Sequence, residues 1–108
     1  MPMTTFDERE RAFEHKFQHD QDLMFRIRAR RDKLAGQWAA GLLGLTGADA
    51  EAYTRQILDT DIATAGPHHI RTRLIDDFRT KGIDISEHRV DKELETLLDT
   101  AHQQVMAE

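Results

Sequence analysis

Residues 5–43 read TFDERERAFEHKFQHDQDLMFRIRARRDKLAGQWAAGLL, and this stretch decides the fold. Thr5 and Glu8 have the spacing of a capping box, in which each side chain satisfies the backbone amide of the other, so a helix is predicted to begin here. The stretch contains no proline and its first glycine is Gly36, so nothing forces a break before about Gly44. At 1.5 Å per residue, such a helix would be about 57 Å long.

Apolar side chains recur along this helix at helical spacing and fall within an arc of about 100°, the width of a core-facing stripe. They are Phe6, Phe13, Phe17, Met24, Ile27, Leu34, Trp38 and Leu42. A compact domain of this length has a radius of gyration of about 13 Å, so its core should cover only the later half of the helix. The first part is therefore expected to overhang or to be disordered, unless the helix breaks and Asp20 caps a second one.

Three shorter helices are predicted to follow, each bounded by its own capping or terminating residues. The first runs from a cap at Thr46 to about Gly66, the second from Pro67 to Gly82, and the third from a cap at Ser86 to the C-terminus. Their apolar faces are Ala50, Tyr53, Ile57 and Leu58; Ile70, Leu74, Ile75 and Phe78; and Ile85, Val90, Leu94, Leu97, Leu98, Ala101 and Val105.

These elements predict an all-α chain, most simply a four-helix bundle with a long N-terminal helix. We divide it into an N-terminal arm, residues 1–20, and a four-helix domain, residues 21–108. The length of 108 residues suits one domain, and 39% hydrophobic residues suit one modest core. Most of the phenylalanines lie in the first 25 residues, which is unusual for an N-terminal segment.

Composition also narrows the classes of function and location. The chain has no cysteine, which removes disulfides and thiolate chemistry and fits a reducing compartment, so we expect a cytoplasmic protein. No apolar stretch approaches the roughly 18 residues of a membrane helix, and no leader sequence is recognised. A net charge of −5 argues against a general nucleic-acid binder.

A basic run, RIRARRDK, spans residues 26–33 and admits two interpretations. Its side chains can pair with the acidic remainder of the chain, since residues 44–108 contain 7 basic and 13 acidic residues. Alternatively, Arg26, Arg30 and Lys33 bind an anion weakly, for instance the phosphates of ATP or ADP. A titration with these nucleotides distinguishes the two interpretations.

No catalytic constellation is recognisable. The sole serine, Ser86, is assigned to a helix cap, and the glycines form no phosphate-binding loop. His15 and His19 have the i, i+4 spacing of a zinc-binding helix, but no third ligand is evident, so solvated histidines are favoured. We expect neither an enzyme nor a metal site.

The residues also resemble a known family. The run TTFDERERAFEHKFQHDQDLMFRIRARRDKLAGQWAA, followed by LGLTGADAEAY and later by GIDIS, is similar to the zeta subunit of the F1Fo-ATP synthase of alphaproteobacteria. The resemblance covers nearly the whole chain. It implies an all-α protein that inhibits ATP hydrolysis by the F1 sector through its N-terminal segment.

That segment corresponds here to residue 4 through about residue 17. The resemblance implies that the arm enters the cleft between the catalytic α and β subunits beside the γ subunit, while the bundle stays outside. It further implies a chain that is monomeric when free and peripheral to the inner membrane when bound to F1. The implied partner-binding residues are Phe6, Asp7, Arg9, Glu10, Arg11, Phe13, Glu14 and Phe17.

Overall fold

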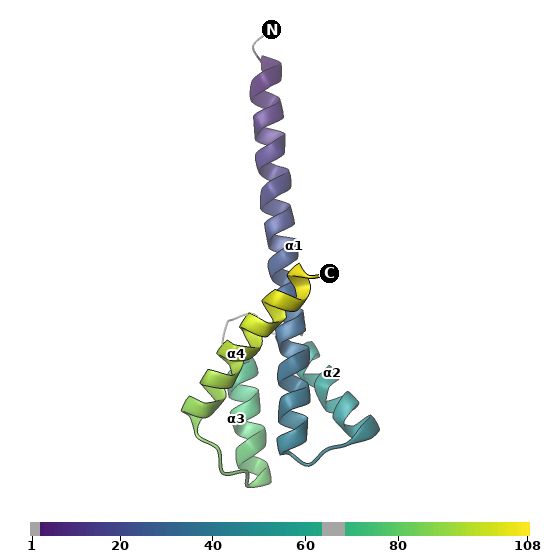
Figure 1. Ribbon diagram of the computed structural model, residues 1–108, viewed down its shortest axis with the longest axis vertical. Coiled ribbons are helices and arrows are strands. Elements are labelled where there is room, and N and C mark those ends of the chain that lie inside the picture. Colours follow the sequence, from purple (N-terminus) through teal and green to yellow (C-terminus); the bar gives the residue numbers. More distant parts are fainter. Residues whose placement is uncertain (1–2, 64–68) are drawn as a thin grey trace.

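The residues that the structure describes fold into four helices, as seen in a computed structural model (Figure 1). The structure describes residues 3–63 and 69–108, with side chains described from His19 onward. The helices are α1 (Met3–Leu42), α2 (Gly47–Ala63), α3 (His69–Lys81) and α4 (Glu87–Met106). No strand occurs among the described residues, so the predicted all-α, four-helix class is confirmed.

Helix α1 is by far the longest element, with 40 residues against 13 to 20 in the others. Figure 1 shows α2, α3 and α4 gathered around its C-terminal half, while its N-terminal half projects alone. The molecule therefore measures 69 Å along its longest axis and only 24 and 23 Å across, with a radius of gyration of 18.4 Å. The predicted overhang is confirmed, and α1 continues through Asp20 without a break.

Two helices end in the same glycine-dependent motif. Gly44 follows α1 and Gly82 follows α3, with φ of 77° and 75°, a left-handed conformation that side chains disfavour. The next residue in each case donates its amide back into the helix: Leu45 to the Ala40 carbonyl at 2.9 Å and Ile83 to the Phe78 carbonyl at 2.8 Å. This is the Schellman motif, and the predicted ends of both helices are confirmed.

The start of α4 also follows its predicted signal. Ser86 has an extended backbone, and its hydroxyl accepts a hydrogen bond from the Arg89 amide at 3.1 Å. Val90 is fully buried and Ile85 packs against the same core, as the predicted hydrophobic staple requires. This cap fixes the direction in which α4 returns along α1.

The core lies around the C-terminal half of α1. The Trp38 and Phe78 rings meet edge to face, with centroids 5.6 Å apart, and join α1 to α3. A smaller cluster, Ile27 with Ala101 and Val105, joins α1 to α4 nearer the projection. The main cluster contains Ala35, Ala39, Ala40, Leu43, Tyr53, Ile57, Ile70, Leu74, Ile75, Phe78 and Val90.

Two residues of the predicted α1 stripe do not lie in the core. Met24 is 60% exposed and Leu42 is 40% exposed, whereas the neighbouring Leu23 and Leu43 pack inward. The reason is that α4 and α2 approach α1 from the flanks of the predicted stripe. Leu23 and Leu43 lie on those flanks, while Met24 and Leu42 lie between them.

The seam between α1 and α2 is built from small residues. Ala35 and Ala39 are fully buried, and Gly36 lies directly against Thr54. A Cβ atom at Gly36 would be 2.8 Å from the Thr54 Cα, which is closer than side chains pack. The absence of side-chain bulk therefore lets the two helix backbones approach closely.

Candidate functional site

The candidate site begins with the part of α1 that projects from the bundle. Its backbone is helical from Met3, but the side chains predicted to bind the partner lie outside the described ones, because these start at residue 19. His19, Asp20, Gln21 and Asp22 are exposed, and Leu23 is the first described residue of α1 that packs inward. Contact with the bundle thus begins close to Leu23.

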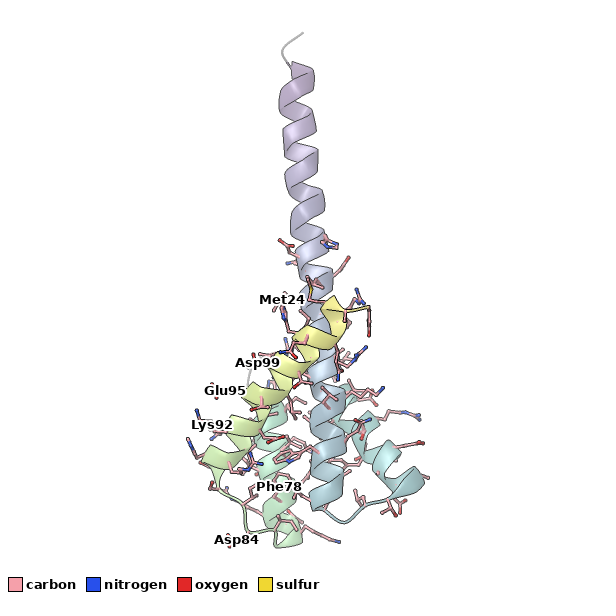
Figure 2. The ribbon with its side chains drawn as sticks, viewed as in Figure 1. Met24, Phe78, Asp84, Lys92, Glu95 and Asp99 are labelled. Atoms are coloured by element: carbon pink, nitrogen blue, oxygen red, sulfur yellow. The ribbon has the colours of Figure 1, made fainter. Side chains whose placement is uncertain are left out.

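An apolar patch marks the place where α1 leaves the bundle. Met24 and Phe25 are 60% and 62% exposed, and Leu98 of α4 is exposed beside them. Figure 2 places Met24 on α1 close to the C-terminal end of α4. These three residues border an open groove of about 640 Å³, together with Asp20, Gln21, Ile27, Arg28 and Arg31.

The first ion-paired joint at this level connects α1 to the end of α4. Arg26 donates from Nη2 to Oε2 of Glu108 at 2.8 Å, and Arg30 donates to the other carboxylate oxygen of the same residue. Arg30 also donates to the Gln104 side chain at 3.0 Å. The hydrogen bonds from Arg30 and then Arg26 lower the pKa of Glu108, so the joint weakens only in acid.

A second joint connects α1 to the last turns of α2. Arg28 donates from Nε and Nη2 to the two carboxylate oxygens of Asp61 at 2.9 and 2.7 Å, a bidentate pair. Asp61 also accepts a hydrogen bond from the Asp32 carboxyl, and Arg31 donates from Nε to Asp32 Oδ1 at 2.8 Å. Four side chains therefore form one connected cluster.

The two carboxyl groups of this cluster have opposite pKa shifts. Burial, with the hydrogen bond to Asp61, raises the pKa of Asp32 to about 7, although Arg31 acts in the other direction. Burial acts to raise the pKa of Asp61 as well, but the hydrogen bonds from Asp32 and Arg28 outweigh it and the pKa falls. Asp32 is therefore the group that carries the proton.

The four arginines of the basic run are thus ion-paired within the chain. Arg26 and Arg30 come together around Glu108, while Lys33 is exposed and lines a different groove, between α1 and α2. The contacts support the interpretation that this run pairs with the acidic remainder. An anion at Arg26 and Arg30 would have to compete with Glu108, and the anion site stays a prediction.

Sequence reasoning missed Asp32 and Asp61. In the sequence Asp32 stands within the basic run of residues 26–33, yet it is 1% exposed. Its one local signal is its place on the α1 arc between Ala35 and Gly36, which is the arc that faces α2. Asp61 lies 29 positions further along the chain, and no local sequence pattern indicates that the two residues pair.

Two kinds of feature are absent from the part of the chain that the structure describes. They contain no group of three or more His, Cys, Asp or Glu side chains arranged to hold a metal ion. None of the helices they form has the length and apolar character needed to cross a membrane.

Comparison with known proteins gives the projecting helix a context. Residues 3–104 match the family described as ATPase inhibitor subunit zeta. The chain belongs to this family. No curated protein and no solved structure matches the chain. The zeta match spans α1, α2, α3 and most of α4, so it covers the projection and the bundle alike.

Membership in the zeta family confirms the resemblance found in the sequence. It gives the chain a regulatory role, that of an ATPase inhibitor subunit, and it implies association with ATP synthase.

Proposed function

We propose that the chain inhibits ATP hydrolysis by the F1 sector of ATP synthase by inserting its N-terminal segment between the catalytic α and β subunits beside γ. The observation that carries this proposal is the projection of α1, a single helix that extends far beyond the bundle (Figure 1). A protruding helix can enter a cleft that a globular bundle is too wide to enter.

The dimensions suit this mode of binding. The segment from Met3 to residue 18 extends about 24 Å at 1.5 Å per residue, while the bundle behind it is 24 by 23 Å across. The helix can therefore reach inside a neighbouring protein while the bundle stays at the surface. A wedge of this kind opposes rotation without any catalytic chemistry of its own.

The energetics favour the aromatic residues of the arm as the contacts. Burial of one phenylalanine side chain contributes about 1.5 to 3 kcal/mol. Phe6, Phe13 and Phe17 together offset much of the cost of association, and a segment that is helical before binding has less ordering entropy to lose. Charged neighbours such as Arg9 and Glu10 then form polar contacts with the enzyme at the rim of the interface.

Deletion of residues 1–18 tests the proposal. The shortened protein retains both core clusters, so we expect it to stay folded but to lose inhibition of purified F1. Steady-state ATP hydrolysis, measured against protein concentration, gives the inhibition, and circular dichroism gives the folded state. A deletion variant that inhibits as strongly as the full chain would show that the arm is not the inhibitory element.

Single substitutions assign the contact within the arm. Phe13→Ala or Phe17→Ala is expected to weaken inhibition at least tenfold, the equivalent of about 1.4 kcal/mol, with little change in the thermal midpoint. Leu42→Ala is the matched control, because Leu42 is an exposed apolar residue of the same helix at the opposite end. Equal inhibition by the Phe variants and the control would contradict the assignment.

The proposal includes the state of the chain before and after binding. We infer a free monomer in the cytoplasm that is peripheral to the inner membrane only while bound to F1, with no nucleic-acid partner. Co-sedimentation with isolated F1, which carries no membrane sector, tests whether F1 alone is sufficient for binding.

A further inference from the structure

The Asp32 and Asp61 carboxyl groups form a buried pair between two helices. Asp32 lies on α1 and is 1% exposed, and the Asp61 side chain, near the end of α2, is 8% exposed. A hydrogen bond joins the two carboxyl groups directly. Two carboxyl groups in such contact hold one proton between them, because two adjacent carboxylates repel each other.

Among the described residues, two arginines act on the pair. Arg31 acts on Asp32, and both Arg28 and Arg31 act on Asp61. With the proton present, the cluster has two guanidinium groups and one carboxylate. Without it, a second carboxylate becomes charged in a place that water barely reaches, and the hydrogen bond that joined the two helices is replaced by repulsion.

The position of the pair determines which part of the chain responds to loss of the proton. Asp61 lies two residues before the end of α2 at Ala63, and the last turn of α2 has no basic residue. Negative charge is unfavourable at the C-terminal end of a helix, where the backbone carbonyls already point outward. A second carboxylate here would therefore weaken the last turn of α2 and its hold on α1.

We propose that Asp32 and Asp61 form a proton-dependent clasp, in which a shared proton fastens the last turn of α2 to α1 and loss of that proton above neutral pH releases the turn. The clasp lies on the part of α1 that the bundle surrounds, nine positions after Leu23, so its state sets how firmly the end of α2 holds that part of α1. This inference does not depend on how the chain binds F1.

The direction of the pH effect follows from the protonation states. Burial raises the pKa of Asp32 to about 7, above the value of about 3.9 expected in the unfolded chain. The folded protein therefore holds this proton more tightly, and its stabilising effect is complete below about pH 4 and lost as the pH rises to about 7. The lowered pKa of Asp61 acts only below this window.

Nuclear magnetic resonance tests the clasp directly. We expect the Asp32 side-chain carboxyl carbon to titrate with a midpoint near pH 7. Protection from hydrogen exchange at amides 59–63 should fall about tenfold between pH 6 and pH 8. In Asp32→Asn, whose amide still donates a hydrogen bond but cannot ionise, that fall should be absent.

Two variants serve as controls for the clasp. His69→Gln, a substitution at the first residue of α3, should keep the pH response. Asp59→Asn, an exposed carboxylate of the same helix, should also keep it. An Asp32 midpoint below pH 5, or a response that survives in Asp32→Asn and vanishes in His69→Gln, would overturn the proposal. The carboxyl titration uses the unaltered chain, so it decides the matter even if Asp32→Asn fails to fold.

Discussion

Gly36 shows how a single absent side chain positions a helix. Because a Cβ atom there would lie 2.8 Å from the Thr54 backbone, Gly36→Ala must push α1 and α2 apart. We expect a loss of about 1 to 3 kcal/mol in the free energy of unfolding, measured by urea denaturation, even though alanine favours helix more than glycine does.

Gly41 provides the matched control on the same helix. Apart from its chain neighbours and the nearby backbone of α1, nothing lies within 4 Å of the place that a Cβ atom would take at Gly41, and its φ is not in the left-handed range. Gly41→Ala should therefore stabilise the protein by about 0.5 to 1 kcal/mol through helix propensity alone. Equal effects of the two substitutions would mean that the α1–α2 seam is not tightly packed.

At this scale the sequence predicts side-chain burial only partly. Trp38, Tyr53 and Phe78 were correctly placed in the core, since large apolar residues at helical spacing carry a strong signal. Met24 lies on the predicted stripe but is exposed, because its burial depends on the angle at which α4 crosses α1. Burial of Asp32 was hidden for a further reason: no local feature marks a carboxyl group whose partner comes from another helix.

At the scale of the helix, three of the predicted ends are confirmed, whereas those predicted near Gly66 and at Pro67 lie outside the described residues. Gly44, Gly82 and Ser86 each act through hydrogen bonds and backbone conformation within a few residues. The signal that ends or begins the helix can therefore be recognised in a short stretch of sequence. The contacts between helices are different. Ion pairs join Arg28 to Asp61, 33 positions apart, and Arg71 to Asp91, 20 positions apart. Pairs so far apart in the sequence depend on how the helices pack in three dimensions.

The Ser86 cap makes a prediction at this scale. Ser86→Ala removes the acceptor for the Arg89 amide and should lower the free energy of unfolding by about 1 kcal/mol. Thr96→Ala is the control, since the Thr96 hydroxyl is exposed and only bonds back to the Lys92 carbonyl within α4. Thermal denaturation of both variants checks the difference, and a larger loss in Thr96→Ala would contradict the role of the cap.

At the scale of the whole molecule, the length of the projection can be measured in solution. Deletion of residues 1–18 should reduce the maximum dimension, seen by small-angle X-ray scattering, from about 69 Å to about 45 Å. The thermal midpoint should change by only a few degrees, because the core clusters lie beyond the deletion. An unchanged maximum dimension would mean that the arm folds back onto the bundle or that the chain self-associates.

The continuity of α1 has a mechanical consequence. No loop separates the projecting half from the half that the bundle surrounds, so a sideways force on the tip acts on the molecule as on a lever. The bending moment is largest near Leu23, where α1 enters the bundle. Just beyond this point, the Arg28–Asp61 and Arg30–Glu108 ion pairs hold α1 from two sides. A rotating partner that pushes on the tip would therefore have to turn the bundle as well. The bundle would in this way anchor the projecting helix.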